Sequence, residues 1–157
     1  MGEVHRLLAR EAPFNLQAAG RLMMEIFAPW VQDLSLLVES VEAVRPPGAD
    51  LQWQPGAVVR MPFGQKLCGD GGVVCSQALM ALADTAMTIA CAAAWNGYRP
   101  MSTIDQTTHF LRPVKFDIVA DARVVRMGRS TSFGRVMLSG AADRRPVGMV
   151  ATAYALN

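Results

Sequence analysis

The chain has 157 residues, of which 52% are hydrophobic and 18% are charged, and its formal net charge is +2. This length favours a single domain over residues 1–157 with a substantial core. The small net charge argues against a nucleic-acid-binding protein. The three cysteines are odd in number and lack Cys-x-x-Cys spacing, so they support neither a disulfide framework nor a zinc site. So high an apolar content in a short chain favours burial of surface against another subunit.

The N-terminal region predicts one short helix after an irregular start. Residues 1–13 are expected to be a loose lead-in, and they lack the continuous apolar core of a secretory signal, so we expect a cytoplasmic protein. Asn15 can cap a helix that runs to about Ala28, because apolar residues recur at helical spacing after it. Pro29 is expected to end this amphipathic helix.

Period-two alternation and turn residues predict the strands. Two β-prone stretches precede the central part of the chain, at 34–44 and 57–61, and proline stops each of them. Four more strands follow it, at 103–111, 118–125, 133–140 and 147–155. Because these four succeed one another through short turns, we expect them to form an antiparallel meander.

Residues 71–91 are the stretch around which we expect the chain to be organised, and after Gly71-Gly72 no helix breaker occurs before Asn96-Gly97. The stretch is rich in Ala, Leu and Met, which favour helix. It is apolar almost all the way round, which is typical of a helix enclosed by protein. Ser76 or Cys75 is the expected first residue, and Asn96-Gly97 is a good stop. One long helix with a sheet large enough to wrap it is an α+β architecture.

Asp84 lies in the middle of this helix, where a buried carboxylate without a partner costs several kcal/mol, on the order of 5. We favour a functional carboxylate. Two alternatives are a side chain that merely accepts hydrogen bonds from a neighbouring strand, and a solvated position, which Met80, Ala81 and Met87 oppose. The stretch is also long enough to span a bilayer, although its central charge opposes insertion.

Four phrases, in this order, resemble one known family. They are Gly72-Val73-Val74 before the helix, 79–86 (LMALADTA) on it, Phe110-Leu111-Arg112-Pro113 after it, and 122–129 (ARVVRMGR). Together they are similar to the hotdog-fold acyl-CoA thioesterases of the phenylacetate-pathway, or PaaI-like, type, over about 34–156. The resemblance implies a hotdog fold, in which a sheet wraps a central helix. It also implies a homodimer whose sheets join, often paired again as a homotetramer.

The resemblance assigns the central chemistry to Asp84, which corresponds to a catalytic carboxylate that acts as general base or as nucleophile. The family's usual His-Gly-Gly lies nine residues earlier, where this chain has Cys75-Ser76-Gln77. Ser76 takes the position of the first glycine, whose backbone N–H polarises the thioester carbonyl. That role needs an amide at a helix N-terminus, not a particular side chain. The resemblance implies that Asp84 of one subunit faces the Ser76 amide of the other.

Two hydroxyls are candidates for positioning water or the carboxylate. Thr88 lies one turn after Asp84 on the same face, and its alternative is a hydrogen bond to its own backbone. Thr103, on the strand after the helix, resembles a hydroxyl that some relatives place near the water.

Cys75 is either a nucleophile at the helix N-terminus or, as we favour, a small packing residue. A Cys–His pair would need His5 or His109, and we expect His109 to be structural. Three polar residues could line the substrate entrance, although the ordinary polarity of loops explains them equally well; they are Gln65, Asp70 and Gln77.

Basic residues near strand ends are candidates to bind the phosphates of coenzyme A, or they form a solvated rim. They are Arg112, Lys115, Arg126 and Arg129. The chain has no Walker loop, no Gly-x-Gly-x-x-Gly after a strand and no His-Glu-x-x-His, so nucleotide hydrolysis, nicotinamide binding and zinc chemistry lack support. Coenzyme A would be part of the substrate, and no separate cofactor is expected.

These observations predict an acyl-CoA thioester hydrolase that acts as a dimer or a dimer of dimers, with no nucleic-acid or membrane partner. One alternative is an acyl-thioester hydratase or dehydratase, which usually pairs a carboxylate with a nearby histidine. Another is a non-catalytic acyl-CoA-binding protein, in which loss of the histidine reflects lost chemistry.

Overall fold

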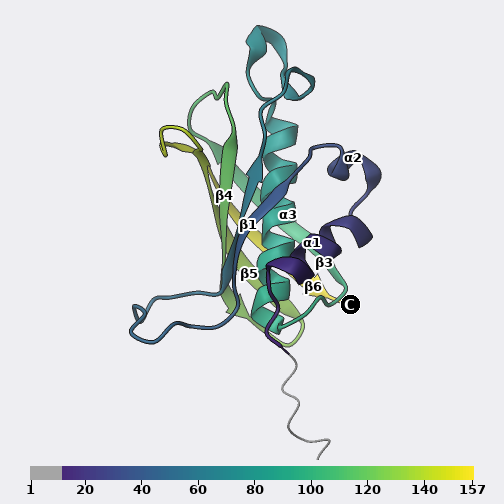
Figure 1. Ribbon diagram of the computed structural model, residues 1–157, viewed down its shortest axis with the longest axis vertical. Helices are drawn as coiled ribbons and strands as arrows, with labels where there is room; N and C mark the ends of the chain where they lie inside the picture. Colours follow the sequence, from purple (N-terminus) through teal and green to yellow (C-terminus); the bar gives the residue numbers. More distant parts are fainter. Residues whose placement is uncertain (1–11) are drawn as a thin grey trace, which may run out of the picture.

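The computed structural model describes residues 12–157, so most of the predicted lead-in lies outside the described residues. An antiparallel sheet has the strand order β1-β2-β4-β5-β6-β3. Its strands are β1 (Leu37–Glu42), β2 (Gly56–Met61), β3 (Met101–Phe110), β4 (Ile118–Met127), β5 (Thr131–Gly140) and β6 (Pro146–Leu156). The long helix α3 (Ser76–Trp95) lies along one face of this sheet, with α1 (Leu16–Glu25) and α2 (Pro29–Gln32) beside it (Figure 1). The predicted α+β hotdog fold is confirmed.

Helix α3 has the predicted bounds. Cys75 is its N-cap residue in an extended conformation, and Asn96 ends it in the left-handed conformation with φ 59°. Asparagine tolerates this conformation better than most residues. The N–H of Gly97 then donates to Ala92 O at 2.8 Å, which satisfies a carbonyl of the last turn. The Asn96 side chain also accepts a hydrogen bond from the N–H of Phe14, so the start of the described chain is tied to the end of α3.

The core forms where α3 packs on the inner face of the sheet. In β4, Ile118, Ala120 and Ala122 are fully buried, and the residues between them point to the outer face. Gly134 in β5 allows a close approach, because a Cβ at this position would lie 2.3 Å from Met87 Sδ on α3. Small residues at the contact therefore let the helix sit close to the strands.

Among the described residues, α3 is also the helix with the length and hydropathy of a membrane span. Most of that stretch is buried inside the protein, as expected for the core helix that the sheet wraps. The burial explains its apolar composition without a bilayer.

The predicted helix from Asn15 to Ala28 is partly wrong. Asn15 does cap α1, since its side chain accepts from the N–H of Ala18, but α1 ends at Glu25. Pro29 does more than end a helix, because it is the first residue of α2. Proline suits this position, where the missing N–H would have had no intrahelical partner.

The predicted four-strand meander is also wrong in one respect. Strands β4, β5 and β6 are consecutive neighbours, but β3 pairs with β6 at the edge of the sheet, and β4 pairs with β2. Alternation in a sequence shows which residues share a face of a strand. It does not show which strand lies alongside, because the segment between β3 and β4 can cross to another part of the sheet.

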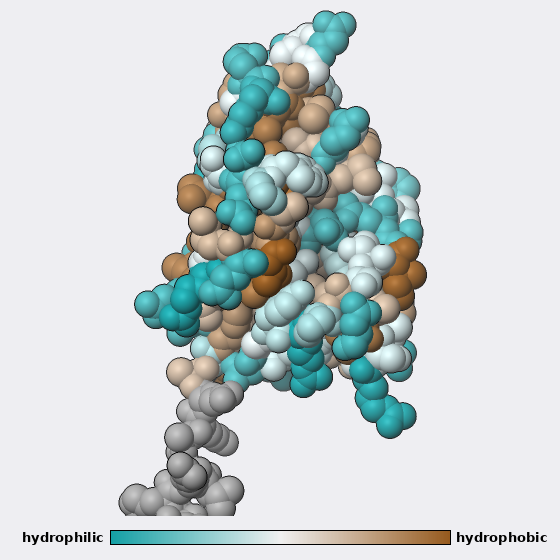
Figure 2. All heavy atoms as spheres, turned by 90° about the vertical axis from the view of Figure 1, so that its right-hand side faces the viewer, coloured by the Kyte–Doolittle hydropathy of each residue, from teal (hydrophilic) through white to brown (hydrophobic). Residues whose placement is uncertain are grey.

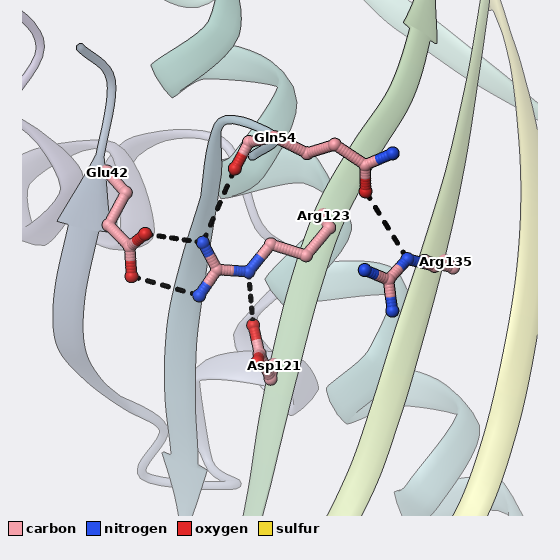
Figure 3. Close-up of polar contacts among 5 residues, drawn as sticks. All are labelled: Glu42, Gln54, Asp121, Arg123 and Arg135. Atoms are coloured by element: carbon pink, nitrogen blue, oxygen red, sulfur yellow. Dashed lines mark hydrogen bonds and ion pairs between the residues drawn. The ribbon is translucent and has the colours of Figure 1, made fainter. Parts of the chain in front are cut away.

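On the outer face, a row of polar side chains joins β1, β2 and β4 (Figure 3). Glu42, Gly56 and Arg123 are register partners across the three strands. Because Gly56 has no side chain, Arg123 reaches over β2 and binds both carboxylate oxygens of Glu42, at 2.5 and 2.9 Å. Its Nε also donates to Asp121 at 2.6 Å. The Arg123 hydrogen bond and charge hold the pKa of Glu42 below its ordinary value.

Candidate active site

Asp84 projects from the middle of α3 toward the strands at the edge of the sheet. Its Oδ1 accepts a hydrogen bond from the hydroxyl of Tyr154 at 2.7 Å and another from Thr103 Oγ1 at 3.1 Å. Among the described residues, no donor reaches Oδ2 within hydrogen-bond distance. The carboxylate is therefore anchored through one oxygen, and the other stays available to a ligand.

Asp84 lines a cavity of about 400 Å³ between α3, α2 and β3. Apolar and polar side chains share its wall; they are Trp30, Gln77, Met80, Ala81, Asp84, Thr103 and Gln106. Figure 2 looks onto this side of the molecule, and apolar surface gathers in its middle between patches of polar atoms. The predicted residues Gln77 and Thr103 thus lie with Asp84, and the cavity adds Trp30 and Gln106, which the sequence did not single out.

Tyr154 is a site residue that the sequence alone did not indicate. It lies on the inner face of β6 and is only 1% exposed. Burial, together with the adjacent Asp84 carboxylate, raises the pKa of Tyr154 far above its ordinary value. Its hydroxyl therefore stays protonated at neutral pH and donates to the carboxylate.

The Thr88 hydroxyl is engaged with its own helix. Thr88 Oγ1 donates to the backbone carbonyl of Asp84 at 3.0 Å, and the side chain is buried. This is the structural alternative that the sequence analysis left open for Thr88. Thr103, not Thr88, is the threonine that contacts the Asp84 side chain.

Ser76 is the first residue of α3, and it lines a second cavity of about 460 Å³. This cavity lies against the segment after β3; its wall is formed by Val73, Val74, Ser76, Leu79, Phe110, Leu111, Arg112 and Pro113. The first backbone hydrogen bond into the helix is from Leu79 N to Cys75 O at 3.3 Å. The N–H groups of Ser76, Gln77 and Ala78 therefore precede the helical ladder, at the positive end of the helix dipole.

The loop before α3 holds Cys75 in place. The N–H of Cys75 donates to Leu67 O at 2.8 Å, and the side chain is half-buried. His109, a possible partner for a Cys–His pair, lines a cavity with Arg135 and Met149 that does not include Cys75. His5 lies outside the described residues. The geometry favours a packing role for Cys75.

Asp70 is exposed and lines neither the Asp84 cavity nor the Ser76 cavity. It begins the 3-10 turn Asp70–Gly72, in which Gly71 and Gly72 have φ of 77° and 69°. Such backbone favours glycine. The Asp-Gly-Gly phrase therefore shapes the entry into α3.

Residues 71–146 match the family model of the thioesterase superfamily. The predicted resemblance to hotdog-fold thioesterases is confirmed at this level, and the match covers α3, Asp84, Ser76 and the strands β3 to β5. Thioester hydrolysis is thus the activity that the superfamily supports. No curated protein matches the chain significantly.

Solved structures agree with this fold. The Escherichia coli PaaI protein from the phenylacetic acid degradation operon is 19% identical, over 90% of this chain and 93% of that chain, with a TM-score of 0.72. Zebrafish thioesterase superfamily member 2 is 21% identical, over 90% and 98%, with a TM-score of 0.70. A conserved protein of Pseudomonas aeruginosa is 22% identical, over 87% and 98%, with a TM-score of 0.71. At such identities the likeness shows the hotdog fold alone.

The basic residues proposed for the phosphates of a thioesterase substrate do not come together within one chain. Arg112 binds both carboxylate oxygens of Asp143, at 2.8 and 2.9 Å, and the carbonyls of Pro146 and Arg145. The Arg145 backbone N–H and the Arg112 guanidinium hold the pKa of Asp143 below its ordinary value. Arg112 therefore joins two loops, a partner that spacing alone did not reveal.

Arg126 and Arg129 are exposed at the opposite end of the sheet from Ser76. They lie at the end of β4 and in the turn after it, where Ser130 O accepts from Leu156 N near the start of β3. Lys115 is exposed near the N-terminal end of α3, where Val74 N donates to Val114 O. Only a second chain could bring Arg126 or Arg129 near the Ser76 of the first.

Proposed function

We propose that the protein hydrolyses acyl-CoA thioesters, with Asp84 as the group that assists the attack of water on the thioester carbonyl. The observation that carries this proposal is the way the Asp84 carboxylate is held beside a cavity. One of its oxygens is held by Tyr154 and Thr103, and the carboxylate lines a cavity whose wall combines apolar and polar side chains. A purely structural carboxylate has no need of a cavity that is large enough for an acyl group. The match of residues 71–146 to the thioesterase superfamily supports the same class of reaction.

In the proposed reaction, Asp84 takes a proton from a water molecule as the water oxygen bonds to the thioester carbon. An alternative in the same site is direct attack by the carboxylate, followed by hydrolysis of the anhydride. The carbonyl oxygen becomes negative and is stabilised by the N–H groups at the start of α3. The carbon–sulfur bond then breaks, and the leaving sulfur takes the proton that Asp84 accepted from water, so coenzyme A departs as its thiol. No separate cofactor takes part in these steps.

The proposal includes a homodimer, with a dimer of dimers as a further level. Among the described strands, β3 is at the edge of the sheet, and most of its residues are exposed, including Ile104 and Phe110. An open edge of this length is a template for pairing with another strand. Pairing of β3 with its copy in a second chain would join the two sheets and bring the helix N-terminus of one chain toward the Asp84 cavity of the other.

The acyl group would lie against Trp30, Met80 and Ala81 in the Asp84 cavity. Methionine adapts to ligands of different shape, and an exposed tryptophan offers a large apolar face. Trp30 is 59% exposed in the single chain, so it is free to contact a ligand or a partner.

The three cysteines of the chain are free, which agrees with action in the cytoplasm.

Release of free coenzyme A from short, medium, long and aryl acyl-CoAs tests the proposal, with wild type and Asp84→Ala compared and binding measured on the same samples. Turnover that disappears in Asp84→Ala while binding survives would support the hydrolase and the role of Asp84. Tight binding without turnover in the wild type would instead favour an acyl-CoA-binding protein, an alternative that rests on Cys75-Ser76-Gln77 standing in place of His-Gly-Gly.

A further inference from the structure

Tyr154 and Thr103 are direct register partners on β6 and β3, and both donate to the same oxygen of Asp84. We infer that Tyr154 is a positioning residue for the proposed hydrolysis, which together with Thr103 fixes Asp84 so that Oδ2 is presented to the substrate. The inference rests on the proposed function. It adds a requirement that the superfamily match does not supply, because Tyr154 lies outside the matched residues 71–146.

The hydroxyl of Tyr154 is not needed for core packing. Tyr154 is among the largest fully buried side chains, and a phenylalanine would fill the same core space without a polar atom to satisfy. A buried tyrosine hydroxyl needs a hydrogen-bond partner. Its short contact is with Asp84 Oδ1 at 2.7 Å, while the Asp84 backbone carbonyl is 3.5 Å away. The residue therefore combines a core ring with one donor aimed at the carboxylate.

The hydroxyl of Tyr154 keeps its proton. Burial and the charge of Asp84 raise the pKa of Tyr154, so the hydroxyl does not ionise in the range where the enzyme would work. A group that keeps its proton is a lasting hydrogen-bond donor and not a base. Its effect on the reaction must therefore pass through Asp84, which is what defines a positioning residue.

Strand β3 has a bulge directly after Thr103. The pairing of β3 with β6 shifts between Thr103 and Asp105, at Ile104. In a regular strand, residues three apart point to opposite faces, but the extra residue lets both Thr103 and Gln106 face α3. Thr103 reaches the Asp84 side chain, and Gln106 Nε2 donates to Met80 O at 3.0 Å. The strand is thus irregular at the place where it holds the carboxylate and its helix.

The test compares Tyr154→Phe with Tyr98→Phe, the same change at the chain's other tyrosine, which is 39% exposed. Tyr154→Phe keeps the ring and removes only the donor. We expect kcat to fall about 10- to 100-fold with little change in KM, because a carboxylate released from its anchor samples unproductive orientations. Tyr98→Phe should change neither.

A double-mutant cycle separates positioning from a general effect on the fold. In an Asp84→Asn background, Tyr154→Phe should cause no further loss of the residual rate, because there is no carboxylate left to position. Thr103→Val should lower kcat, and Thr103→Ser, which keeps the hydroxyl, should restore it.

A Tyr154→Phe enzyme with wild-type kcat would overturn the positioning role and leave the proposed function intact. An equal loss from Tyr154→Phe in the wild-type and Asp84→Asn backgrounds would also overturn it. A wild-type protein without any turnover would overturn the proposed function, and the role of Tyr154 with it.

Discussion

Asp84 and Ser76 lie on one helix, yet they line two separate cavities. Eight residues of helix separate them by about 12 Å along the axis, so one chain does not present both groups to a single carbonyl. A carbonyl next to Asp84 must obtain its oxyanion donors from elsewhere. The helix N-terminus of a second chain is the source that the proposed dimer would provide.

The role of the Ser76 N–H predicts a large difference between two substitutions. Ser76→Pro removes this N–H at the first helical position, where proline is tolerated. The preceding residue, Cys75, already has φ −72° and ψ 153°, which are compatible with a following proline. We expect kcat to fall about 10²- to 10³-fold in Ser76→Pro, because one oxyanion donor is lost.

Ser76→Ala is the matched control, since it keeps the N–H and removes only the hydroxyl, whose hydrogen bond is with the neighbouring Gln77 side chain. Steady-state kinetics on the best acyl-CoA would show near wild-type turnover for Ser76→Ala. Equal rates for the two variants, with both folded by circular dichroism, would mean that this amide does not stabilise the transition state.

Mixed dimers test whether the site is shared between subunits. Asp84→Asn and Ser76→Pro chains are each expected to have little activity alone. Co-expressed with different tags and purified as a mixture, they should regain about a quarter of the wild-type activity, because half of the dimers are mixed and each has one intact site of two. A mixture that stays as inactive as its parts would place both groups in the same chain, against the two cavities observed here.

The elements that the sequence predicted well depend on local chemistry. Residues 76–95 are apolar all round and have Asn96-Gly97 at the end, so both the helix and its burial could be predicted. Asp84 stood out because it is the charge within that helix. Tyr154 did not, because its link to Asp84 spans 70 residues and depends on the pairing of β3 with β6. Arg112 resembled a phosphate ligand until its ion pair with Asp143 was seen, and that pair depends on two loops.

Replacing a glycine by alanine should have opposite effects at Gly56, which lies between Glu42 and Arg123 in the sheet, and at Gly20 in α1. A Cβ on Gly56 would lie 2.2 Å from Ala122 O and 2.8 Å from Arg123 Cδ, so Gly56→Ala must displace backbone. We expect it to lower the free energy of unfolding by about 1 to 3 kcal/mol. In contrast, Gly20 is exposed in α1 with nothing near its Cβ position, and Gly20→Ala should raise stability by about 0.4 to 1 kcal/mol.

Urea unfolding at neutral pH measures both changes. A stability of Gly56→Ala equal to wild type would mean that β2 can move away from β4 without cost. It would also weaken the view that Arg123 needs the glycine to reach Glu42.

Cys91 predicts how stability depends on alkaline pH. It is fully buried in α3 next to Ser132, and burial raises the pKa of its thiol from 9.0 to about 11. Between these values the unfolded chain has lost the thiol proton while the folded chain keeps it. The folded state therefore binds more protons, and the free energy of unfolding should fall as pH rises, by up to about 1.4 kcal/mol per pH unit for this group. Tyr154, whose pKa is also raised, adds to the fall at higher pH.

Urea unfolding at pH 7 and pH 10.5 would measure this fall for the wild type and for Cys91→Ala. The variant loses one alkaline-sensitive group, so its stability should fall less between the two pH values, whatever its stability at pH 7. Iodoacetamide provides an independent check, because only the thiolate reacts and a buried thiol ionises late. Cys91 should stay unlabelled in the folded protein at pH 8 and become labelled in urea. Identical pH dependence in both proteins, or rapid labelling of folded Cys91, would mean that the thiol reaches solvent and that α3 opens more readily than its packing indicates.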